Sequence, residues 1–383
     1  MTRILWLALL CATACKRPAS HAEQALPLLG QHCLPCHGAP GSPGAVPPAL
    51  DSYEAAARVG EQITRVVQRR EMPPFGADAT GLCGRFRDAR WLAPAEIAVL
   101  STWPAQSPAR IRASPRALPP RMHVEPALGP RTLSLDPGAW SPGLGDGLAR
   151  CFAIDPHLEK DAVATAIALD RGAGIRQLSL FALDGADAAR ATKDGWACGP
   201  DAGRPSARLL AAWSWNVPTL RLPAATGVRL PAGAPLVLRL VHNAVASGAS
   251  TAVHPVVQLE LGQPPAEGRL EPGRTRTTLT ATRRIERPLL LHGVLPRMHA
   301  RGVLLRARLL RAGREECLAY FGHWNPYDAQ LFAYEAPLRL APGDVVSLQC
   351  VLGTVGLADA AAEGLADGDE ACAVHLYVTS PAP

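Results

Sequence analysis

Short runs in which aliphatic residues alternate with polar ones dominate the chain after residue 130. A period of two places alternate side chains on opposite faces of an extended strand, so each run predicts a strand with one buried face. Turn sequences, such as the Leu-Pro-Ala-Gly at 230–233, separate the runs and predict antiparallel β-sandwiches. The clearest runs are residues 177–183, 235–241, 252–261 and 302–310.

A different pattern precedes this region. Asp88–Trp103 predicts one helix, because Ile97, Leu100 and Trp103 recur at helical spacing after Pro94. The chain is therefore expected to have five parts, with a short tether, residues 16–30, between the first part and the second. They are a signal peptide (1–15), a compact unit (31–104), a Pro/Arg-rich linker (105–130) and two sandwiches (131–265 and 266–383), divided near a Pro- and Gly-rich break at 262–273.

The N-terminus predicts export. Arg3 is followed by an apolar run, Ile4–Ala14, which matches a signal-peptide core and is too short to span a bilayer. Cys15 then either becomes a lipidated first residue or lies beside an ordinary cleavage site. The expected location is the periplasm, or the outer membrane or cell surface as a lipoprotein. A membrane contact is expected only through this lipid anchor.

Composition narrows the function classes. Only three of the 39 basic residues are lysines, and no basic run is interleaved with aromatics, so nucleic-acid binding is not expected. Ten cysteines in an exported chain predict disulfides.

The sequence Cys33-Leu34-Pro35-Cys36-His37 has the C-x-x-C-H pattern of c-type haem attachment. Two thiols at this spacing can add to the two vinyl groups of one haem, and the next histidine then reaches the iron. A redox-active disulfide is the alternative interpretation. Met72, 35 residues after His37, is the expected second axial ligand, because the following prolines stiffen its loop; the alternative is a core methionine. From the haem motif to the predicted helix, the stretch resembles small bacterial cytochrome c domains, which implies an all-α unit.

Several later segments together resemble the copper type II monooxygenases, the family of peptidylglycine and dopamine β-monooxygenases. The resemblance covers roughly residues 130–380 and implies two antiparallel, jelly-roll-like β-sandwiches that each bear one copper. It also implies the disulfides Cys350–Cys372 and Cys151–Cys198. Cys83 and Cys317 remain, either as free thiols or paired with each other. The segments are Cys151–Pro156, Leu236–Asn243, Gly293–His299 and Gly368–Cys372.

The copper ligands that the family would place here are mostly replaced. The first site keeps His242, but Arg176 and Gln177 stand where a His-His pair is implied. The second site keeps His299, whereas Arg297 replaces a histidine and Ala371 replaces the methionine. Met298 is not expected to substitute, because it points to the other face of its strand. Packing is an alternative role for His242 and His299, and a rearranged site would draw on His254, His292, His323 or His375.

Three functions are consistent with these observations. The first is an exported haem protein that carries electrons to or from a redox partner protein or small donor, on sandwiches that have lost their copper. The second is a copper-dependent monooxygenase that hydroxylates a small organic substrate with electrons from the attached haem. The third is a binding protein with an incidental haem. Haem c is the expected cofactor, and the replaced ligands argue against copper.

Overall fold

The computed structural model describes most of the helices and strands of the chain. The described residues are 21–39, 47–78, 80–87, 89–104, 128–141, 149–170, 175–199, 202–204, 206–214, 219–242, 254–264, 269–273, 276–277, 280–298, 302–325, 330–353 and 372–381. The signal region with Cys15 and residues 105–127 of the predicted linker lie outside the described residues.

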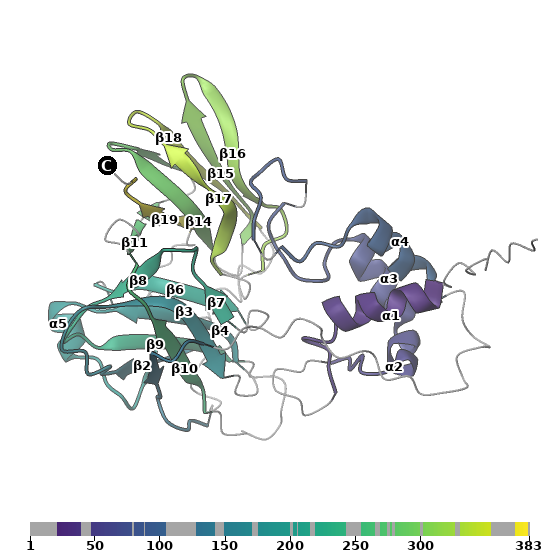
Figure 1. Ribbon diagram of the computed structural model, residues 1–383, viewed down its shortest axis with the longest axis horizontal. Coiled ribbons are helices and arrows are strands. Elements are labelled where there is room, and N and C mark those ends of the chain that lie inside the picture. Colours follow the sequence, from purple (N-terminus) through teal and green to yellow (C-terminus); the bar gives the residue numbers. More distant parts are fainter. Residues whose placement is uncertain are drawn as a thin grey trace, which may run out of the picture.

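Four helices pack around an apolar core of their own, apart from the sandwiches (Figure 1). Leu29, Leu100 and Trp103 are fully buried in this core, which we call the helical core. Pro94 begins the last helix, as expected for a residue that lacks the N–H a helix start does not need. The helices are α1 (His21–His32), α2 (Tyr53–Arg58), α3 (Gly60–Gln68) and α4 (Pro94–Thr102).

The prediction of a tether over residues 16–30 is wrong for residues 21–30, and residues 16–20 lie outside the described residues. Residues 21–30 belong to α1, and the side chains of Ala25 and Leu29 are fully buried in the helical core. The pattern was missed because Pro27 stands inside the helix and obscures the helical period. The helical part of the chain therefore begins before the C-x-x-C-H motif.

The first sandwich consists of two antiparallel sheets. One has the order β5-β2-β9-β4-β6, and the other runs β1-β10-β3-β8 with β7 beside β3. The short helix α5 (Gly185–Ala189) follows β4. The strands are β1 (Thr132–Leu135), β2 (Ala149–Ile154), β3 (Ala162–Asp170), β4 (Ile175–Ala182), β5 (Trp196–Ala197), β6 (Arg208–Ser214), β7 (Thr219–Arg221), β8 (Gly227–Leu230), β9 (Leu236–His242) and β10 (Val256–Leu261).

The second sandwich repeats this arrangement. Its sheets have the orders β13-β18-β15-β16 and β11-β19-β14-β17, and β12 pairs with β19. The four alternating runs of the sequence are confirmed as β4, β9, β10 and β15. The strands are β11 (Arg269–Gly273), β12 (Arg276–Thr277), β13 (Thr280–Arg284), β14 (Leu289–Met298), β15 (Gly302–Arg311), β16 (Arg314–Phe321), β17 (Phe332–Leu340), β18 (Val345–Leu352) and β19 (Cys372–Thr379).

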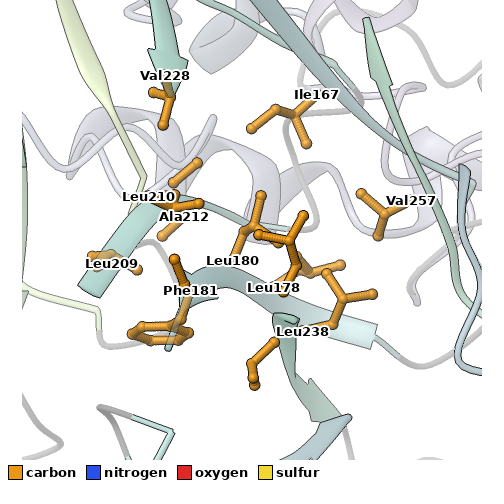
Figure 2. Packing of buried hydrophobic residues seen from close by; sticks show 14 of the residues in the cluster. Ile167, Leu178, Leu180, Phe181, Leu209, Leu210, Ala212, Val228, Leu238 and Val257 are labelled. Atoms are coloured by element: carbon orange, nitrogen blue, oxygen red, sulfur yellow. The ribbon is translucent and has the colours of Figure 1, made fainter. Parts of the chain in front are cut away.

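Alternation builds the core of the first sandwich. Leu178 and Leu180 project from β4 toward the opposite sheet, where they meet Ile167 and Val257 (Figure 2). All four side chains are fully buried. Burying a leucine or isoleucine side chain stabilises a fold by about 1.5–3 kcal/mol, so this layer is a major source of stability.

One sheet continues from the first sandwich into the second. β8 and β11 pair in parallel, with Gly227 opposite Arg269, so the two four-stranded halves form one hydrogen-bonded sheet. The Tyr377 hydroxyl, fully buried, donates to the carbonyl oxygen of Leu210 at 2.9 Å across the two sandwiches. The Pro- and Gly-rich segment expected as a break thus contains the strand that joins the sandwiches.

Three disulfides lie within the described residues, in the pairs Cys83–Cys317, Cys151–Cys198 and Cys350–Cys372. The last two are the pairs that the sequence led us to expect. Three disulfides are typical of a protein exported to an oxidising compartment. No helix within the described part of the chain is long and apolar enough to cross a membrane.

A partly buried ion pair, in which Asp344 is buried and Arg311 is 37% exposed, closes the turn between β17 and β18. Arg311 Nη2 lies 2.7 Å from Asp344 Oδ2, and the Ala341 N–H donates to the same oxygen at 2.8 Å. The Asp344 side chain is only 5% exposed. These hydrogen bonds, first that of Arg311, lower the pKa of the Asp344 carboxyl.

We expect Asp344→Asn to lower the free energy of unfolding by about 2 kcal/mol, because Arg311 loses its charged acceptor. A lowered folded pKa stabilises the protein above the unfolded value, about 3.9, and this contribution is lost as the pH falls through the folded value. Urea unfolding of the oxidised chain at pH 7 and at pH 3 checks both points. The variant should be weaker at pH 7 and less sensitive to acid.

Glu315→Gln is the matched control. Its carboxylate pairs with Arg308 at 3.1 Å, but the Glu315 side chain is 56% exposed. Removal of this charge should change the stability by less than about 0.5 kcal/mol. Equal losses in the two variants would show that the burial of Asp344 does not matter.

Candidate functional site

The C-x-x-C-H motif continues the last turn of α1. The Cys33 N–H donates to the Leu29 carbonyl at 3.0 Å, and the His37 N–H donates to the Cys33 carbonyl at 2.8 Å. Cys33 is half-buried and packs against the helical core, and Cys36 is buried. Neither cysteine takes part in a disulfide.

The His37 ring is held in a fixed tautomer. Its Nδ1 atom lies 2.9 Å from the carbonyl oxygen of Pro48. A carbonyl oxygen can only accept, so Nδ1 carries the hydrogen, and the lone pair of Nε2 is left for a metal. The Leu50 N–H donates to the His37 carbonyl at 2.6 Å, which fixes the backbone as well. Such a hydrogen bond on the second ring nitrogen is typical of a metal-ligating histidine.

The thiol of Cys33 does not resemble a redox-active one. Burial, with a smaller contribution from Cys36, raises the pKa of the Cys33 thiol to about 12. Redox-active C-x-x-C motifs need a thiolate near neutral pH, so their pKa values are lowered instead.

Met72 lies on the surface beyond α3. Its side chain is 36% exposed, so the alternative of a buried core methionine is wrong. The N–H groups of Glu71 and Met72 both donate to the Val66 carbonyl, at 2.9 and 3.3 Å, and this turn fixes where the methionine begins. Met72 is thus accessible from the surface.

Two of the positions implied for the first copper site, Gln177 and His242, lie on neighbouring strands. β4 and β9 are neighbours, with Ile175 opposite His242 and Gln177 opposite Val241, across an irregularity between 175 and 177. Gln177 is buried, and its amide oxygen accepts from Arg239 Nη1 at 3.3 Å. A guanidinium thus stands beside a position that a metal would need.

His242 is a packed residue. It is 4% exposed, and its ring meets the Trp140 ring edge-on with 5.0 Å between centroids. This environment agrees with the packing alternative for His242.

The second implied site can be described only in part. Arg297 is half-buried on β14, and Met298 is buried in the core of the second sandwich, which agrees with its expected orientation away from a site. His299 and Ala371 lie outside the described residues, so the arrangement of that site stays a prediction.

The other histidines have partners of their own or lie apart. His254 Nε2 lies 2.7 Å from Asp136 Oδ1 on the surface, and His292 Nε2 lies 2.8 Å from Thr379 Oγ1. His323 is exposed, and His375 is buried on β19. Within the described residues, no group of three or more His, Cys, Asp or Glu side chains could hold a metal ion.

Sequence reasoning missed two features of the helical part of the chain. The first is the Pro48 carbonyl that orients His37, because a backbone acceptor leaves no signal in the residue pattern. The second is the segment 75–91, which we call the strap: it leaves the helical core and packs on the second sandwich. The one sequence signal for this contact is that Cys83 and Cys317 remain as a possible disulfide pair after the other cysteines are assigned.

Comparison with known proteins adds no identification. A scan against models of protein families finds no matching family, and a search of curated proteins finds no similar protein.

Proposed function

We propose that this chain is an exported c-type haem protein that carries electrons, and that its sandwich pair derives from a copper type II monooxygenase that has lost its copper. The geometry of the C-x-x-C-H motif is the observation that carries this proposal. Two reduced cysteines and a histidine with Nε2 available for iron occur together on one turn. These are the groups that c-type haem attachment needs.

The described residues fit a haem. Cys33 and Cys36 would hold it through thioether bonds, and His37 Nε2 and Met72 Sδ would be its axial ligands. When bound, the haem supplies one-electron cycling of its iron between two oxidation states. A methionine ligand favours the reduced state and raises the reduction potential.

The chain's own residues would control the environment of that haem. Leu29, Leu50 and Leu100 are buried in the helical core and exclude water from the inner side of the motif. An apolar shell lowers the local dielectric, which disfavours the more highly charged oxidised iron. The exposed Met72 marks the side on which electrons would enter or leave.

The first sandwich supports the loss of copper. Arg176 and Gln177 stand where the resemblance implies a His-His pair, and an arginine stays protonated and cannot coordinate. The amide oxygen of Gln177 accepts instead from Arg239. The core that holds β4 against the opposite sheet is made of apolar side chains. Such a fold can persist after its metal ligands are replaced.

The proposed setting follows from export. The chain would work in the periplasm, or at the outer membrane or cell surface through a lipid on Cys15. Its partner would be a redox protein or a small electron donor.

We predict that Cys33→Ala/Cys36→Ala abolishes covalent haem attachment. Haem staining after denaturing electrophoresis measures this, with the protein exported by a host that attaches c-type haem. The unchanged chain should carry about one covalent haem, and its reversible one-electron reduction should be visible in the absorption spectrum.

Cys151→Ser/Cys198→Ser is the control for the loss of two cysteines. This variant removes a disulfide of the first sandwich and should keep the covalent haem. Haem that remains covalent in Cys33→Ala/Cys36→Ala would contradict the assignment of the motif.

We also predict that Arg176→His/Gln177→His restores copper binding in the first sandwich. The resemblance implies that these two positions and His242 form one site, and β4 pairs with β9 so that Gln177 lies opposite Val241, the residue before His242. Copper per chain after removal of loosely bound metal should rise by about one equivalent, and adding His242→Ala should abolish that rise. Absence of any rise in a folded variant would refute the implied correspondence of these positions.

A further inference from the structure

The loop that carries Met72 runs directly into the strap, residues 75–91. Three residues after Met72, Phe75 packs against the core of the second sandwich. The chain returns just as abruptly: Trp91 contacts the second sandwich, whereas Leu92 is buried in the helical core. The Met72 loop and the strap are therefore one excursion between two neighbouring cores, beside β16 and β17 (Figure 1).

Backbone hydrogen bonds join the strap to one end strand of each sheet of the second sandwich. The Asp78 N–H donates to the Tyr320 carbonyl on β16 at 2.8 Å, and the Arg87 N–H donates to the Ala333 carbonyl on β17 at 2.7 Å. β16 and β17 are the last strands of their respective sheets. The strap thus covers two sheet edges that would otherwise present unpaired backbone groups.

Aromatic side chains fill the contact. Phe75 meets Phe332 and Trp91 edge-on, each with 5.1 Å between ring centroids, and Phe86 stacks on Tyr334 at 5.0 Å. The indole N–H of Trp91 donates to the Ala77 carbonyl at 3.0 Å and closes the base of the strap. Aromatic pairs of this kind contribute about 0.5–1.5 kcal/mol each beyond their buried area.

A disulfide and a glycine fix the tip. Cys83 is bonded to Cys317 of β16, across 234 residues of sequence. Gly84 has φ +94°, and a Cβ atom there would lie 2.9 Å from the Leu318 carbonyl oxygen, so only glycine permits this approach. Gly81 has a similar φ of +75°, but a Cβ atom there would meet nothing within 4 Å.

We propose that the second sandwich, through the strap and the Cys83–Cys317 disulfide, is the positioning element that keeps Met72 on the haem iron. This inference rests on the proposed haem function. A methionine loop without such an anchor gains conformational entropy when the ligand dissociates, and the disulfide removes that gain by tethering the strap. Loss of the tether should open one coordination position of the iron to external ligands.

The experiment uses the full-length, haem-loaded protein and compares Cys83→Ser/Cys317→Ser with the unchanged chain. Two readouts report the methionine–iron bond: its weak long-wavelength absorption band in the oxidised protein, and the affinity of the reduced protein for carbon monoxide. We expect the band to weaken and the affinity to rise at least about tenfold, since closing a long loop with a disulfide is worth a few kcal/mol. Cys151→Ser/Cys198→Ser should match the unchanged chain in both readouts.

Gly84→Ala tests the same contact without removing a disulfide. It should shift both readouts in the same direction, whereas Gly81→Ala, with the same type of backbone strain but no clash, should not. This pair keeps the test decisive if the cysteine variant fails to fold.

Met72→Ala separates the failure of this inference from the failure of the proposed function. If the unchanged chain has the methionine band but the strap variants behave like it, the positioning role is refuted and the haem assignment stands. If the unchanged chain lacks the band and binds carbon monoxide as Met72→Ala does, Met72 is not a ligand, and both the inference and that part of the proposed function are overturned.

Discussion

The parallel pairing of β8 with β11 is the constraint on which the rest of the structure depends. It turns two sandwiches into one continuous sheet, and the buried hydroxyl of Tyr377 ties the same two units together through Leu210. Because the second sandwich is fixed to the first, the edges of β16 and β17 have a fixed place, and the strap can cover both. The strap in turn attaches the helical core to the second sandwich, because the chain enters the strap after Met72 and is back in the helical core at Leu92.

Under the proposed function, the apolar core accounts for the persistence of the fold without copper. The core around Leu178 and Leu180 is apolar and is built by alternation alone, so exchange of ligands on the opposite face of β4 leaves it intact. At that face, Gln177 and Arg239 satisfy each other by a hydrogen bond. This hydrogen bond satisfies a buried amide oxygen and leaves the pairing of β4 with β9 undisturbed.

Much of the fold could be predicted from the sequence, and the failures have physical causes. Alternation located β4 and β15 to within about two residues, and Pro94 marked the start of α4, because these signals are local. α1 was missed because Pro27 interrupts its period, and β11 was missed because Pro272 and Gly273 resemble a break. At the site, C-x-x-C-H and Met72 were readable as residue types. The Pro48 carbonyl and the strap contact were not, since both depend on residues brought together only by the tertiary structure.

The most direct test of the account is the metal content of the exported protein. Iron and copper would be quantified on one sample after secretion by a host that attaches c-type haem, loading with copper, and removal of loosely bound metal. The account predicts about one iron and no retained copper per chain. About two coppers per chain would contradict it, because the sandwiches would then hold a working pair of metal sites and the chain would be a monooxygenase supplied with electrons by its own haem.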